Sequence, residues 1–109
     1  MADWRERIEA EFQKAEKARA MNNEGQARVC ARRAAGMAVR EYLTRKRAPP
    51  RTASAYDLLN IIKDDPHLSP DLKLIAEHLT LRVTEEFKLP VDVDLVAEAR
   101  ELCNQLLKE

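Results

Sequence analysis

The residues of this chain best suited to bind a ligand form a basic cluster near its middle. The cluster consists of Arg40, Arg45, Lys46, Arg47 and Arg51. An arginine presents a planar fork of N–H donors that can hold a phosphate or a carboxylate through two hydrogen bonds. The cluster therefore predicts a site for RNA, a nucleotide or an acidic partner surface. The alternative is that these side chains cap the end of a helix and pair with neighbouring acids, because the segment lacks a series of aromatic residues that could stack bases.

The other residue types that carry chemistry show no recognisable catalytic or metal-binding spacing. The candidates are two histidines and two cysteines, namely His67, His78, Cys30 and Cys103. None of them follows the spacing of metal ligands, and the two glycines are isolated, which excludes a phosphate-binding glycine loop. We therefore predict no catalytic residue, no metal and no cofactor. Both cysteines are expected to be buried and inert in a reducing cytosol.

Length and composition limit the fold and the compartment. The chain has 109 residues, of which 45% are apolar, 35% are charged and two are glycine. This composition is too apolar for a disordered chain and too poor in glycine for a turn-rich β fold, so we expect one helical domain over residues 1–109. Basic and acidic residues balance at 19 each, so no overall field draws the protein to nucleic acid or membrane. The charged N-terminal segment and the lack of a long apolar run predict a cytoplasmic protein.

Start and stop signals divide the chain into five predicted helices, which indicates an all-α fold, a single up-and-down helical bundle. Residues that can cap a helix precede each of them: Asp3, Asn23, Thr52 or Ser54, Ser69, and Asp92 or Asp94. Prolines stop the second helix at residues 49 and 50 and the fourth at residue 90. The fourth helix is therefore expected to continue through Leu81, Val83 and Phe87.

The second predicted helix is apolar on two opposite sides. Its second apolar line consists of Val29, Gly36, Val39 and Leu43. Four arginines border this line: Arg28, Arg32, Arg33 and Arg40. The fourth helix has a similar extra line around His78. A domain of this size cannot readily bury both lines, so we predict a homodimer. The expected interface residues are Val39, Leu43, Leu74, His78 and Leu81.

The order of the elements resembles the HEPN family of small helical bundles. The resemblance rests on a long alanine-rich helix, ARVCARRAAGMAVREYL, followed by a short helix YDLLNII, a helix ending near a proline, EFKLP, and a last helix VDLVAEARELCNQLL. It implies a bundle that commonly dimerises and is often encoded beside a minimal nucleotidyltransferase. Many members of the family are metal-independent ribonucleases or toxins.

The catalytic signature of those ribonucleases, an arginine followed after four to six residues by a histidine, is absent. No arginine precedes His67 or His78 at that spacing, and no histidine follows Arg82. We therefore expect a non-catalytic module that binds a partner protein, possibly a nucleotidyltransferase, or an anionic ligand. Two alternatives remain open, namely a divergent RNA-cleaving protein that uses His78 or Arg82, and a structural helical adaptor unrelated to the family.

Overall fold

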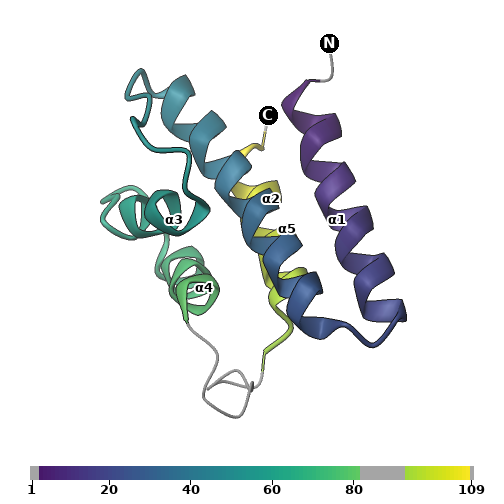
Figure 1. Cartoon of the computed structure of the whole chain (residues 1–109). Helices are drawn as coiled ribbons and strands as arrows, with labels where there is room; N and C mark the ends of the chain where they lie inside the picture. The colour runs from purple at the N-terminus through teal and green to yellow at the C-terminus, as the bar shows by residue number, and fades with distance from the viewer. Residues whose placement is uncertain (1–2, 82–92, 109) are drawn as a thin grey trace.

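The computed structural model describes residues 3–81 and 93–108, which fold into five α-helices (Figure 1). They are α1 (Trp4–Ala20), α2 (Glu24–Arg45), α3 (Ala55–Lys63), α4 (Pro70–Thr80) and α5 (Leu95–Leu106). Helices account for 75% of the described residues, and this part of the chain contains no strand. The prediction of an all-α bundle of five helices is therefore confirmed.

Each helix begins at one of the predicted capping residues, whose side chain accepts a hydrogen bond from a first-turn amide. The acceptors are Asp3, Asn23, Ser54, Ser69 and Asp94. The structure thereby decides between the alternatives at the third and fifth helices. Thr52 instead accepts a hydrogen bond from the Ser54 amide at 3.1 Å, which holds the capping residue in place.

The long helix α2 lies at the centre and contacts α1, α3 and α5, while α4 contacts α3 and α5. In Figure 1, α1 lies antiparallel to α2 on one side, and α3 lies on the other. The core contains the largest fully buried side chains, which are Phe12, Leu59, Ile62, Leu79, Leu95 and Leu102. Among the described helices, none combines the length and the apolar character that a bilayer crossing needs.

The middle of the second apolar line of α2, at Gly36 and Val39, is buried inside the chain. Val39 is fully buried, and Gly36 lies so close to the start of α3 that an added Cβ would meet the Cβ of Ala55 at 2.8 Å and its Cα at 2.9 Å. Leu43 is half-buried and packs against the core. Val39, which we predicted to lie at the interface, is therefore covered within the chain and offers no exposed surface to a second copy. One chain covers both sides of α2 because glycine and alanine allow the helices to approach closely.

Helix α4 ends earlier than the proline signal predicts. Its last helical residue is Thr80, and Leu81 caps it with extended backbone at φ −67° and ψ 142°. The predicted continuation through Val83 and Phe87 to the proline lies outside the described residues, as do Arg82 and Asp92. An arginine from α2 holds this helix end, because Arg32 donates to the carbonyls of Leu79 and Leu81, each at 2.7 Å.

The close approach at Gly36 makes a testable prediction about stability. Replacing a helical glycine by alanine normally stabilises a protein by about 0.5–1 kcal/mol. We expect Gly36→Ala to lower the free energy of unfolding by about 1–3 kcal/mol instead, because the new methyl group overpacks against the backbone of Ala55. Urea unfolding followed by circular dichroism measures this difference.

Gly25→Ala is the matched control, since a Cβ there meets its nearest atom, Oδ1 of Asn23, only at 3.9 Å. This variant should be as stable as the parent protein or more stable. A Gly36→Ala protein with unchanged or increased stability would contradict the packing of α3 on α2.

Candidate anion-binding site

Two members of the predicted basic cluster are engaged within the fold at the end of α2. Arg45 pairs with Glu41 at 3.2 Å and lies 5.0 Å from the centre of the Trp4 ring. Lys46 lies 3.6 Å from a carboxylate oxygen of Asp65 and 4.5 Å from the centre of the Tyr42 ring. Such contacts fit the alternative given above for the basic cluster, in which its side chains cap the end of a helix and pair with neighbouring acids.

The Tyr42 hydroxyl completes this anchor. It donates to Asp65 at 2.7 Å and so joins α2 to the turn between α3 and α4. Burial raises the pKa of Tyr42 above its usual value, so the hydroxyl keeps its proton as a donor throughout the neutral range.

Arg47 terminates α2 through its backbone. Its φ is +61°, its amide donates to the Thr44 carbonyl at 3.0 Å, and the next amide, of Ala48, donates to the Leu43 carbonyl at 2.9 Å. This is the hydrogen-bond pattern of a Schellman motif, in which the left-handed position is usually glycine. The side chains of Arg47 and Arg51 are exposed, and neither lines a hollow that the structure describes.

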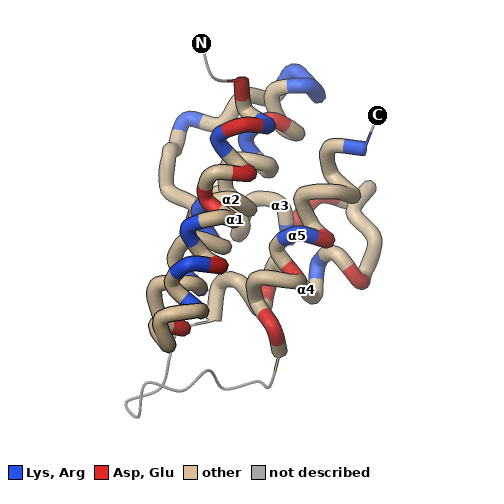
Figure 2. Tube along the Cα trace, turned by 90° about the vertical axis from the view of Figure 1, so that its right-hand side faces the viewer, with Lys and Arg blue, Asp and Glu red and all other residues tan. Residues whose placement is uncertain are grey.

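Two further arginines pair with acids and connect helices. Arg19 bonds Glu24 at 2.6 Å and Asp94 at 3.0 Å, which links α1 to the starts of α2 and α5. Hydrogen bonds from Arg19 hold the pKa values of both carboxyls below their usual range. Arg100 on α5 reaches two carboxylates of α1, those of Glu9 at 3.3 Å and Glu16 at 3.2 Å. Basic and acidic residues are accordingly mixed along α1 (Figure 2).

Three arginines differ from these because they line a common hollow. Arg7, Arg33 and Arg40 make no side-chain hydrogen bond or ion pair with any residue that the structure describes. They surround a hollow of about 430 Å³, which we call the arginine hollow. The rest of its lining is apolar and consists of Gly36, Met37, Ala53, Ala55 and Leu58. No described acidic residue lines it, so every charged side chain of its lining is positive although the net charge of the whole chain is zero.

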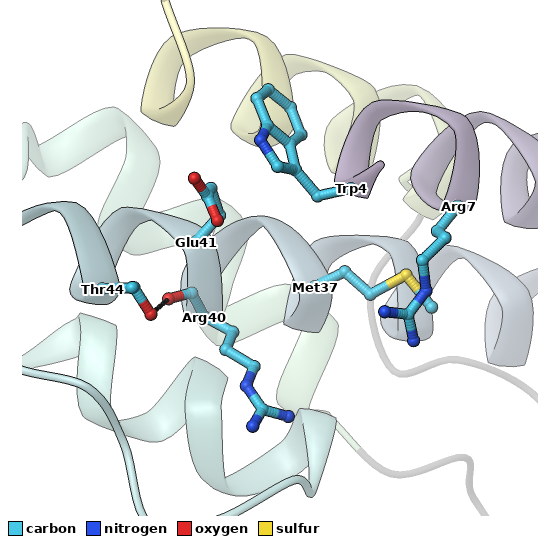
Figure 3. A pocket seen from close by; sticks show the side chains of 6 residues that line it. All are labelled: Trp4, Arg7, Met37, Arg40, Glu41 and Thr44. Carbon is cyan, nitrogen blue, oxygen red and sulfur yellow. Dashed lines mark hydrogen bonds between the residues drawn. The ribbon is translucent and has the colours of Figure 1, made fainter. Parts of the chain in front are cut away.

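A second hollow of about 330 Å³ adjoins the first and shares Arg7, Met37 and Arg40 with it. Its other lining residues are Trp4, Glu41 and Thr44. In Figure 3 the side chains of Trp4 and Glu41 point to one side of α2 and that of Arg40 points to the opposite side, while Arg7 extends from α1 toward α2 and ends over Met37 in this view. The guanidinium of Arg40 therefore points away from the carboxylate of Glu41.

Helical spacing and one close helix contact build the arginine hollow. Arg33 and Arg40 are seven residues apart on α2, so they lie on one face, two turns from each other. Arg7 comes from α1, across the antiparallel pair (Figure 1). Gly36, between the two α2 arginines, admits Ala55 and so brings the start of α3 to the opposite wall. An anionic ligand lying across this hollow would have three donor groups from two helices along its border.

Sequence reasoning found only part of this site. Of the predicted cluster, the structure brings Arg40 alone to the arginine hollow. Arg33 could have been selected from its seven-residue spacing to Arg40. Arg7 could not, because its position depends on how α1 pairs with α2, and nothing near Arg7 in the sequence indicates that.

Most of the predicted interface residues are buried or half-buried within the single chain. The side chain of His78 is 13% exposed, and its Nδ1 lies 2.7 Å from Oε1 of Glu98, which joins α4 to α5. Leu81 is half-buried at the end of α4. Leu74 is 50% exposed and is the member of the set most accessible to a partner.

The residues that could hold a metal or react as nucleophiles are dispersed or buried. In the described ranges, no three His, Cys, Asp or Glu side chains are grouped so that they could hold a metal ion. Cys30 and Cys103 are free and buried, and burial raises the pKa of Cys103 to about 12. Cys103 is therefore a protonated core thiol at neutral pH rather than a nucleophile.

Arg32 provides a test of how α4 is held. Arg32→Ala leaves two carbonyls at the end of α4 without their charged donor, and we expect a loss of about 1.5–3 kcal/mol in the free energy of unfolding. Arg28→Ala, one turn earlier on α2, should change it by less than about 0.5 kcal/mol. Equal effects of the two substitutions in urea unfolding would contradict the capping role of Arg32.

Comparisons with known proteins identify no relative: no protein-family model, no curated protein and no solved structure matches this chain.

Proposed function

We propose that this protein is a non-catalytic helical module that binds an anionic group of a ligand or partner protein in the arginine hollow. The observation that carries the proposal is that Arg7, Arg33 and Arg40 line one hollow in which no described acidic residue balances them. Several other described cations pair with acids, as Arg19 and Arg100 do. Three like charges around one hollow repel one another, and an anion bound between them relieves that repulsion.

The described histidines support a non-catalytic role. His78 is engaged with Glu98 between α4 and α5, and neither His78 nor His67 lines the arginine hollow. A general base or acid must come within hydrogen-bond reach of the group on which it acts. The enzyme alternative, a divergent RNA-cleaving protein, would therefore need His78 to leave its partner or RNA to bind elsewhere.

The resemblance to the HEPN family supports two further parts of the proposal, homodimerisation and a minimal nucleotidyltransferase as partner. For the homodimer, exposed Leu74 on α4 is the favoured contact, because Val39 is covered within the chain. A partner protein would use the other side of the molecule, where α1 and α2 present the arginines.

The proposed anion binding can be tested with short anionic polymers. At 50 mM salt, a twelve-residue oligouridylate or an oligoglutamate should bind the protein measurably in fluorescence anisotropy. Arg33→Ala combined with Arg40→Ala should weaken the binding at least tenfold, since it removes two of three donors. With about three charge contacts, raising the salt to 200 mM should weaken oligouridylate binding by roughly tenfold or more.

Arg47→Gly serves as the control for this experiment. It removes a cation of the predicted cluster outside the hollow and relieves a left-handed φ, so the protein should bind as before and be more stable. Oligouridylate should also be recovered intact after hours with the parent protein. The proposal fails if neither anion binds, if the arginine pair does not matter, or if RNA is cleaved and His78→Ala abolishes the cleavage.

The homodimer makes a separate prediction. Light scattering should give about twice the chain mass of 12.5 kDa, and Leu74→Glu should restore the monomer mass, because a buried unpaired carboxylate disfavours the interface. The substitution should leave the helical circular dichroism spectrum unchanged, since Leu74 is half exposed in the single chain. A parent protein with the mass of one chain would contradict this part of the proposal.

A further inference from the structure

We infer that the occupant of the arginine hollow is an acidic, amphipathic helical segment of a partner protein, whose carboxylates pair with Arg33 and Arg40 while its apolar face covers the strip between them. This inference rests on the proposed function, in which the hollow holds an anion, and specifies the class of that anion. Four features of the described residues carry it.

The first feature is the spacing of the cations along α2. Seven residues separate Arg33 from Arg40, which corresponds to about 10.5 Å along the helix axis. Carboxylates seven residues apart on a partner helix have the same separation and lie on one face. Each can then accept a bidentate pair of hydrogen bonds from one guanidinium.

The second feature is the apolar lining between the arginines. The side chains of this lining supply no donor. Its accessible part comes from Ala53, which is exposed, and from Met37 and Ala55, which are half-buried, and a wholly charged ligand would leave that part uncovered. An amphipathic helix matches both parts of the site, because apolar side chains cover the strip and charged ones reach its border. Arg7, on the α1 wall, is placed for a carboxylate on the other flank of such a helix.

The third feature is length. The arginine hollow adjoins the second hollow, and together they extend along α2 from Arg33 to Thr44. Eleven residues of helix correspond to about 16.5 Å. This is about three turns of a partner helix, whereas a single phosphate would occupy one point of the surface.

The fourth feature disfavours a nucleic-acid strand. No aromatic side chain lines the arginine hollow, and Trp4 in the adjoining hollow already has the guanidinium groups of Arg5 and Arg45 at 4.9 and 5.0 Å from its ring centre. Bases would therefore lack a stacking surface. A phosphate backbone following both hollows would also meet the carboxylate of Glu41, whereas a polypeptide can place an uncharged or basic residue there.

Designed peptides test the inference on the full-length protein. The matched peptide is a helix of fifteen residues with glutamates at positions 1 and 8 on the border of a leucine stripe. The shuffled peptide has the same composition and helicity, with both glutamates opposite the stripe. We expect the matched peptide to bind at least tenfold tighter than the shuffled peptide, and tighter than a twelve-residue oligouridylate at the same salt concentration.

Charge reversal locates the contact. Arg33→Glu with Arg40→Glu should abolish binding of the matched peptide, and a peptide with lysines at the same two positions should bind this variant and not the parent. Ala53→Glu, at an exposed wall of the hollow, should weaken the matched peptide by more than tenfold. Lys17→Glu with Arg47→Glu makes the same change in net charge outside the hollow and should have little effect. Circular dichroism verifies that each variant remains helical.

The outcomes separate this inference from the proposed function. Tighter binding of oligouridylate than of the matched peptide, dependent on Arg33 and Arg40, would overturn the inference and leave the proposed function standing. Equal binding of matched and shuffled peptides would also overturn it. Failure of both peptides, of oligouridylate and of oligoglutamate to bind would overturn the inference and the proposed function together.

Discussion

The close contact between Gly36 on α2 and Ala55 at the start of α3 is the constraint on which much of this structure depends. It allows α3 to pack on the side of α2 opposite α1, so that one chain covers the middle of a helix that is apolar on two sides (Figure 1). The same contact separates Arg33 from Arg40 by an apolar strip and brings Ala53, Ala55 and Leu58 to the wall of the hollow. Packing and the candidate site therefore have one geometric origin.

Electrostatics divide the arginines of the described chain into groups with different roles. Arg19 and Arg100 donate hydrogen bonds to carboxylates, and these ion pairs connect α1 to α2 and α5. Arg32 uses its donors on carbonyls at the end of α4, where burial lowers its pKa and the neighbouring Arg28 lowers it further. The arginines of the hollow have neither kind of partner among the described residues. A chain without net charge can in this way still present a local positive surface.

The helices could be predicted from the sequence because their signals are local. Capping residues such as Asp3, Asn23 and Ser69 act within one turn, and the apolar periodicity reports helix directly. The end of α4 could not be predicted, since the carbonyls of Leu79 and Leu81 are held by Arg32, which lies 47 and 49 residues earlier in the chain. The burial of Val39 could not be predicted for a similar reason. It depends on the contact at Gly36, which only the tertiary structure reveals. The basic cluster was predicted because its residues are close together in the sequence. The arginines that line the hollow are close together in space instead, and only Arg40 belongs to both groups.

The most direct test of the central claim is the nuclear magnetic resonance response of the individual arginine side chains to an added anion. Each guanidinium gives its own Nε–Hε signal, so a titration with oligoglutamate reports which arginines form the site. The account predicts that the signals of Arg7, Arg33 and Arg40 shift together, with one binding constant, while those of Arg19, Arg32 and Arg100 stay in place. Shifts confined to Arg47 and Arg51, or no shift at any arginine, would contradict it.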